Sequence, residues 1–208
     1  MRIEQWADHL QHLGRASARD PDLLPPDPSL GAGSRGEQRL WRAVAGERVE
    51  LSDLFAPSIP PEGAPILPTD GYLAIEVWTE CELSAMHALW RLLRTRHPAT
   101  AAAGCARLDA AVRWHLVHTQ PDNATNRPWA IHVFLAASIV SGSTRTASDA
   151  ASSSPQNTSQ HALDLPDPAE CALYAETLLS NMLATDARSE ELSRWILRDA
   201  SRELRLLV

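Results

Sequence analysis

Apolar residues recur at helical spacing in successive stretches of this chain, and stretches rich in proline and glycine separate them. Near the start, Ile3, Trp6 and Leu10 recur every three to four positions, with Glu4 and Asp8 between them. This period places apolar side chains on one face of a helix. The sequence therefore predicts an all-α fold, a compact bundle of about seven helices with long proline-rich loops. The predicted helices cover residues 2–13, 37–45, 71–96, 99–119, 127–140, 168–184 and 188–206.

Three segments lack this periodicity. Residues 17–36 and 57–68 are dense in proline and glycine, and we expect loops there because proline lacks the amide hydrogen that a helix needs. Residues 141–166 are rich in serine, threonine and alanine, so we expect a disordered insertion that buries too little apolar surface to fold. Loop closure costs little more as a loop lengthens, so residues 1–208 are predicted to form a single helical domain.

The sequence is compatible with more than one secondary structure in two segments. Residues 47–55 alternate weakly and suit a short strand or a turn. The aromatic and branched residues at 72–78 also suit a strand. We favour a helix at 72–78, because Ile75, Trp78 and Met86 continue one apolar stripe.

Two helix starts have residue types that cap helices. Asp167 followed by Pro168 is a typical first turn, and Asn126 before Arg127 and Pro128 is similar. These pairs predict helices that begin near residues 168 and 127.

The basic residues restrict the chemistry that this chain can perform. All 19 are arginine, so a phosphate-binding lysine and a lysine Schiff base are excluded. The net charge is -7 and the arginines are dispersed among acidic residues, so nucleic acid is not an expected partner. The most apolar run, residues 129–140, is much shorter than the roughly 20 residues of a membrane-spanning helix. We therefore expect no membrane partner.

The cysteines and the start of the chain indicate a compartment. Cys81, Cys105 and Cys171 are far apart and never form a C-x-x-C pair, so we expect core residues in a reducing environment. Residues 1–14 lack the apolar core of a signal peptide. Both observations predict a cytoplasmic protein. Residues 31–36 match the dinucleotide pattern G-x-G-x-x-G, but prolines precede them where a strand is needed, so no cofactor is expected.

Three histidines and a polar turn form the most informative region. His115 lies on the apolar side of its predicted helix, and His118 lies one turn further at the margin. His132 lies in an apolar run and is expected to be buried. The turn between the two helices contains Asp122 and Asn123, which makes a candidate catalytic cluster.

Glu82 is a further candidate, because it falls near the centre of an apolar stripe. An ionised carboxylate there needs a partner, such as a histidine, Arg127 or a metal. The alternative, which we favour from the sequence, is that Thr79 and Glu82 form a capping box and Glu82 is solvated. The spacing of His115 and His118 could also hold Zn²⁺ or Fe²⁺ with Glu82, Asp122 or His132 as third ligand. Structural histidines bonded to the backbone are the favoured alternative.

Other polar and aromatic residues suit ordinary structural roles. Five tryptophans are predicted core residues: Trp78, Trp90, Trp114, Trp129 and Trp195. Four pairs on helices are expected on solvated faces or as local supports: Glu76 with Glu80, Asp109 with Arg113, His87 with Arg91, and Asp199 with Glu203. The last pair borders an apolar stripe, and pairing with arginine is the alternative for it.

The sequence predicts a non-catalytic module that binds a protein partner, because no strong catalytic signature is present. The alternative is a small-molecule-binding protein or a metal-dependent enzyme with a Glu/His cluster. Its candidate catalytic residues are Glu82, His115, His118, His132, Asp122 and Asn123, and its candidate metal ligands are His115, His118 and Glu82.

Overall fold

The computed structural model describes residues 1–15, 17, 25, 35–55, 59–60, 62–72, 74–94, 98–119, 125–139 and 166–208. Within these ranges every regular element is a helix, which confirms the predicted all-α class. The helices are α1 (Ile3–Gly14), α2 (Arg35–Val44), α3 (Ser52–Phe55), α4 (Ile75–Leu93), α5 (Pro98–His118), a helix at 131–139, α7 (Pro168–Ala184), the 3-10 helix η1 (Asp186–Ser189) and α8 (Glu191–Arg205). No helix in the described ranges combines the length and the apolarity needed to cross a bilayer.

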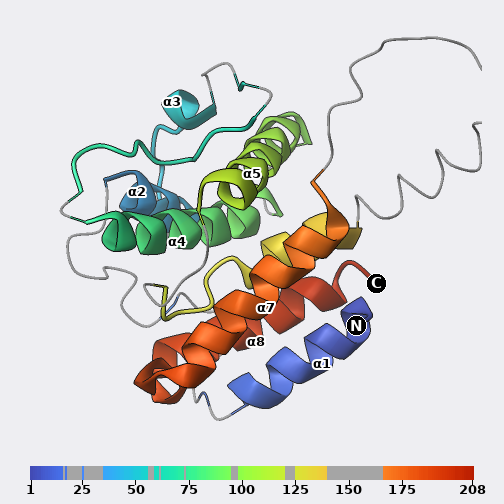
Figure 1. Ribbon diagram of the computed structural model, residues 1–208. Helices are drawn as coiled ribbons and strands as arrows, with labels where there is room; N and C mark the ends of the chain where they lie inside the picture. Colours follow the sequence, from blue (N-terminus) through green and yellow to red (C-terminus); the bar gives the residue numbers. More distant parts are fainter. Residues whose placement is uncertain are drawn as a thin grey trace, which may run out of the picture.

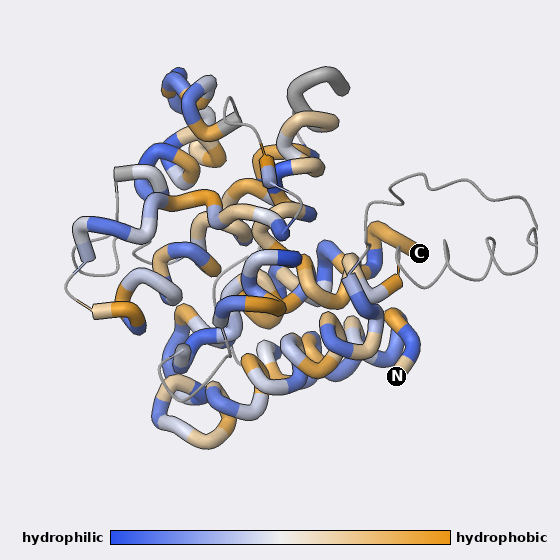
Figure 2. Tube along the Cα trace, turned by 45° about the horizontal axis from the view of Figure 1, so that its top comes forward, coloured by the Kyte–Doolittle hydropathy of each residue, from blue (hydrophilic) through white to orange (hydrophobic). Residues whose placement is uncertain are grey.

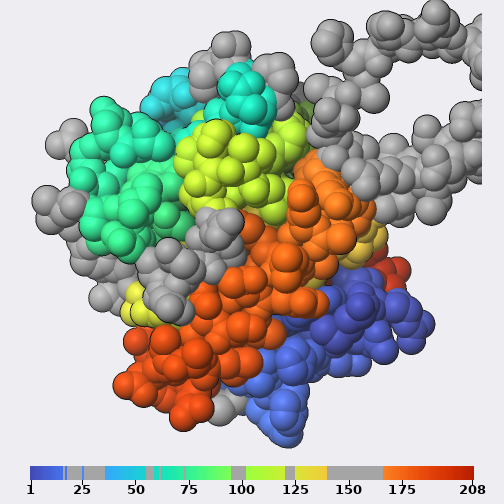
Figure 3. Space-filling view, viewed as in Figure 1, coloured from blue at the N-terminus to red at the C-terminus, as the bar shows by residue number. Residues whose placement is uncertain are grey.

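The first and last helices lie side by side and bring the two ends of the chain together (Figure 1). The Ser201 hydroxyl donates to the carbonyl oxygen of Ala7 at 2.7 Å, and Arg205 pairs with Asp8 at 2.6 Å. A Cβ atom added to Gly14 would lie 2.8 Å from a backbone oxygen of α8, so only glycine permits this close approach. In the space-filling view α7 crosses the face between α5 and α1 (Figure 3).

Helix α4 packs against α2 and α5 (Figure 1). Its residues 81–89 are all buried, so the polar side chains among them need partners inside the protein. Ser84, for example, accepts a hydrogen bond from the indole nitrogen of Trp41 at 3.0 Å. Hydrophobic and hydrophilic residues alternate along much of the chain (Figure 2), as expected of helices with one buried face.

Several predicted boundaries and short elements are corrected. Helix α4 begins at Ile75, after extended Ala74, and not at residue 71. Thr79 and Glu82 therefore lie inside the helix, and the capping-box interpretation is wrong. Residues 47–55 contain the short helix α3 instead of a strand, and the Glu50 carboxylate accepts from the amides of Leu51 and Ser52 at its start.

The helix predicted at 127–140 begins only at residue 131. Ala130 has a φ of 55°, in the left-handed region, which interrupts a helix and is costly for a residue with a Cβ atom. The predicted start at Asn126 is therefore wrong. At Asp167 the prediction is confirmed, because its carboxylate accepts from the amide of Ala169 at 3.3 Å and a proline follows it.

The burial of the cysteines and tryptophans is only partly as predicted. Cys81 and Cys171 are buried, but Cys105 is exposed and is not a core residue. Trp78, Trp129 and Trp195 are fully buried, and the two other predicted core tryptophans, Trp90 and Trp114, are half-buried. The predicted disordered insertion lies outside the described residues apart from Pro166.

Candidate functional site

Glu82 is fully buried and its carboxylate holds the loop that precedes α4. One oxygen accepts from the amide of Ile66 at 2.6 Å and the other from the amide of Leu67 at 2.7 Å. The buried Arg107 donates to the carbonyl oxygens of residues 64–65. Two charged side chains thus satisfy the backbone of four consecutive loop residues. Burial raises the pKa of Glu82 to about 7, against the opposing effects of the two amides and Arg107.

His115 lies beside Glu82, as the sequence indicated. Its Nε2 atom is 3.9 Å from a carboxylate oxygen of Glu82. On the other side of the ring, Nδ1 lies 2.6 Å from the hydroxyl of Thr119 and 3.2 Å from that of Tyr174. Burial lowers the pKa of His115 to about 3, so the ring is neutral at physiological pH. The result is a buried chain from a carboxyl group through a histidine to two hydroxyls.

The other candidates from the sequence are not in this chain of contacts. His118 is exposed at the end of α5 and packs on Trp114, with ring centroids 4.9 Å apart. His132 is fully buried, as expected, but in a different part of the core. Asp122 and Asn123 lie outside the described residues. Among the residues that are described, no three histidine, cysteine or carboxylate side chains are placed to hold a metal ion.

A second polar group, which sequence reasoning missed, surrounds His87 and is here named the buried histidine cluster: His87, His132, Asp199, Arg91 and Arg202. The Nε2 atom of His87 is 2.8 Å from a carboxylate oxygen of Asp199. Its Nδ1 accepts from the amide of Ala130 at 3.4 Å, which places the ring proton on Nε2. The ring of His132 meets that of His87 edge-on, with centroids 4.5 Å apart.

Charge balance in the buried histidine cluster depends on the two arginines. Asp199 is fully buried, 3.3 Å from Arg91 and 2.9 Å from Arg202. Burial raises the pKa of Asp199, whereas both arginines lower it. Burial also lowers the pKa of His87 and His132 well below 6.5, so both rings are neutral. His87, Asp199 and Glu203 are therefore not on solvated faces. Asp199 and Glu203 do pair with arginines, which is the alternative that the sequence offered for them.

Replacing His132 by leucine is expected to raise the free energy of unfolding by about 1 kcal/mol at neutral pH. Neither ring nitrogen of His132 has a hydrogen-bond partner within the described part of the chain, and such a buried group costs about 1 to 3 kcal/mol. The gain should grow as the pH falls below 6.5, because only the unfolded chain then protonates this histidine.

Urea unfolding at several pH values measures this effect. His118→Leu is the matched control, because it removes an exposed histidine and should change stability little at any pH. A His132→Leu variant that is less stable than the wild-type protein at both neutral and acidic pH would contradict the expectation.

An apolar pocket of about 540 Å³ lies between the last turns of α4, the middle of α5, the helix at 131–139 and the C-terminal residues. Its walls are mostly aliphatic and include one aromatic ring: Trp90, Leu93, Leu108, Val112, Val133 and Ala136. Trp90 also contacts the buried histidine cluster, with its ring centroid 5.2 Å from that of His132. Its indole nitrogen donates to Glu203 at 3.0 Å, which fixes the ring in place.

Few polar side chains line this apolar pocket. Arg94 is 3.3 Å from Glu203 and is therefore paired. Arg113 and Asp109 lie one turn apart on α5. The Nε atom of Arg113 is buried and has no hydrogen-bond partner among the described residues. The exposed thiol of Cys105 also lines the pocket.

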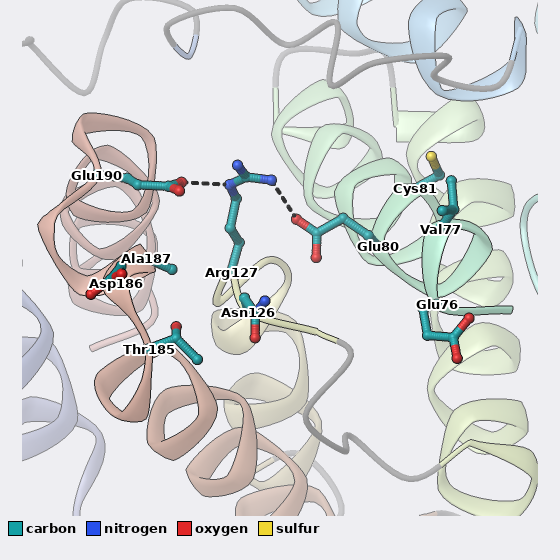
Figure 4. A pocket seen from close by; sticks show the side chains of 10 residues that line it. All are labelled: Glu76, Val77, Glu80, Cys81, Asn126, Arg127, Thr185, Asp186, Ala187 and Glu190. Carbon is teal, nitrogen blue, oxygen red and sulfur yellow. Dashed lines mark hydrogen bonds and ion pairs between the residues drawn. The ribbon is translucent and has the colours of Figure 1, made fainter. Parts of the chain in front are cut away.

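A polar cleft of about 660 Å³ lies between α4, residues 126–127 and η1 (Figure 4). Arg127 lies across it, 3.3 Å from Glu80 and 2.9 Å from Glu190. Burial raises the pKa of Glu80 to about 7, although Arg127 opposes this shift. Glu76, Asp186 and Glu190 also line the cleft, so acidic side chains outnumber basic ones there, and the one arginine among its described lining residues is shared between two carboxylates.

Comparison with known proteins does not assign a family. No protein-family model, curated protein or solved structure matches the chain. The function therefore has to be argued from the geometry of these sites. The fold and the cavities define an all-α domain with an apolar pocket on one side of its buried histidine cluster.

Proposed function

We propose that this protein binds a small apolar molecule in the apolar pocket. The observation that carries the proposal is the pocket itself, a concavity of about 540 Å³ with apolar walls and few polar groups. Pockets of roughly 300 to 1,000 Å³ with this kind of lining are typical small-molecule sites. Each methylene group that a ligand buries there contributes about 0.8 kcal/mol.

The position of the pocket supports this function. Its walls come from α4, α5 and the helix at 131–139, which pack on the core, so the site is formed before a ligand arrives. The Glu82 carboxylate, by contrast, has both oxygens engaged by backbone amides. That arrangement favours a structural role for Glu82 over the alternative of a metal-dependent enzyme.

The protein-interaction module predicted from the sequence stays a prediction. The polar cleft is the surface on which a basic segment of a partner would find opposite charge, because Glu76, Glu80 and Glu190 line it.

Titration with a neutral fluorescent probe, N-phenyl-1-naphthylamine, tests the proposed function. We expect its emission to rise on saturable binding, and straight-chain alcohols to displace it. Decanol should compete at least about tenfold better than octanol, since each methylene group is worth about a factor of four in affinity. Ala137→Trp fills the pocket and should weaken probe binding by about tenfold or more.

Ala106→Trp is the matched control, because Ala106 is exposed on α5 and does not line the pocket. This variant should bind the probe like the wild-type protein. Equal binding by the Ala137→Trp variant, or an absence of saturable binding by the wild-type protein, would refute the proposed function.

A further inference from the structure

We propose that the ligand of the apolar pocket carries a single negative charge, as the carboxylate of a fatty or aromatic acid does, and that Arg113 binds this charge. The inference rests on the proposed function and names the class of its ligand. It follows from the nitrogen of Arg113 that is unpartnered within the described part of the chain, and from the charged side chains that line the pocket.

Arg113 has donor capacity that the described part of the protein does not use. Its Nε atom is buried and has no hydrogen-bond partner there, and none of the ion pairs between described residues involves its guanidinium group. A buried donor without a partner is unfavourable, and a ligand oxygen would satisfy it. The planar guanidinium group matches a carboxylate through two parallel hydrogen bonds.

The neighbouring charges limit the ligand to one negative charge. Arg94 lies on the same pocket but is already paired with Glu203. Asp109 is one turn from Arg113; burial raises the pKa of Asp109, although the charge of Arg113 opposes this shift. One arginine with a nearby carboxylate attracts a monoanion, whereas a more highly charged group would be repelled by Asp109.

The aliphatic walls then bind the remainder of the molecule. Leu108 and Val112 lie on the same helix as Arg113 and line the pocket with it. A ligand whose carboxylate reaches Arg113 would place its hydrocarbon part against these side chains and Trp90. This arrangement combines an apolar site with one orienting polar contact.

A comparison of decanoate with decanol tests the inference, because both have the same chain length and only decanoate is charged at neutral pH. In displacement of N-phenyl-1-naphthylamine we expect decanoate to bind at least about tenfold more tightly, which is the effect of one hydrogen bond to a charged group. Arg113→Gln should remove this preference, so that decanoate binds no more tightly than decanol to that variant. Arg113→Lys, which keeps the charge but lacks the planar guanidinium group, should retain part of the preference for decanoate.

Arg188→Gln is the matched control, because Arg188 is exposed on η1 and lines neither cavity. It changes the net charge equally and should keep the preference for decanoate. Decanol binding as tightly as decanoate, or an unchanged preference in the Arg113→Gln variant, would overturn this inference and leave the proposed function intact. Failure of every apolar probe to bind would overturn both.

Discussion

Replacing Glu82 by glutamine is expected to lower the free energy of unfolding by about 3 kcal/mol. The carboxylate accepts from two buried backbone amides, of Ile66 and Leu67. A glutamine side chain has one oxygen to accept with and an amide group that points a donor at the second N–H. Each buried donor that loses its acceptor costs about 1 to 3 kcal/mol, and the loss of charge adds to this. Urea unfolding at neutral pH measures the difference.

Glu76→Gln is the matched control on the same helix, because Glu76 is exposed and such substitutions change stability by less than about 0.5 kcal/mol. If the Glu82→Gln variant is as stable as the Glu76→Gln variant, the loop is not held by this carboxylate. The same result would remove the reason for regarding Glu82 as structural.

Replacing Asp199 by asparagine is expected to lower the free energy of unfolding by about 3 to 5 kcal/mol. The substitution keeps the shape of the side chain but leaves Arg91 and Arg202 beside a neutral group. The buried His87 also loses the carboxylate that accepts from its Nε2 atom. Removing one member of a buried charge group is costly because the remaining charges keep their desolvation penalty.

Asp186→Asn in η1 serves as the control, because Asp186 is exposed and the substitution removes the same charge. Chemical unfolding of both variants at neutral pH gives the comparison. A loss below about 1 kcal/mol for Asp199→Asn would mean that the buried histidine cluster is not held together by this carboxylate.

The helices were predictable because their apolar period is a local property of the sequence. The N-cap at Asp167 is also local, since the aspartate and the proline after it determine the start of α7. The late start of the helix at 131–139 was not predictable, because Ala130 adopts a left-handed conformation that its residue type disfavours. In this conformation the amide of Ala130 donates to His87, which is a tertiary contact that no local sequence pattern shows.

The candidate site was predictable only in part. The stripe of α4 offered a buried Glu82 as one of two interpretations, and the capping box was the favoured one. The periodicity of α5 indicated a buried His115, so the pair was a candidate but not the preferred interpretation. The hydrogen-bond partners of Glu82 could not be predicted from the sequence, because they are backbone amides of a proline-rich loop that has no periodic pattern. His87 and Asp199 are 112 residues apart in sequence. The one signal for Asp199 was its place beside the apolar stripe of α8, which suggested a solvated border or a pairing with arginine but did not identify Arg91 or His87 as partners.

The apolar pocket could not be predicted from local patterns at all. Its residues come from α4, α5, the helix at 131–139 and the end of the chain, so they are brought together only by tertiary packing. Individually, Leu108 and Val112 resemble any other core residues of an amphipathic helix. The unpartnered nitrogen of Arg113 likewise becomes visible only when its surroundings are known.

The most direct test of ligand binding in the apolar pocket is the rate at which iodoacetamide alkylates Cys105. This thiol lines the pocket and is exposed, whereas Cys81 and Cys171 are buried, so the reaction reports on one site. In mildly alkaline buffer, which offsets the raised pKa of Cys105, we expect decanoate to slow alkylation at least about tenfold at saturation. The midpoint of this protection should equal that of probe displacement. Saturable binding of decanoate with no change in the alkylation rate would place the ligand elsewhere and contradict the account.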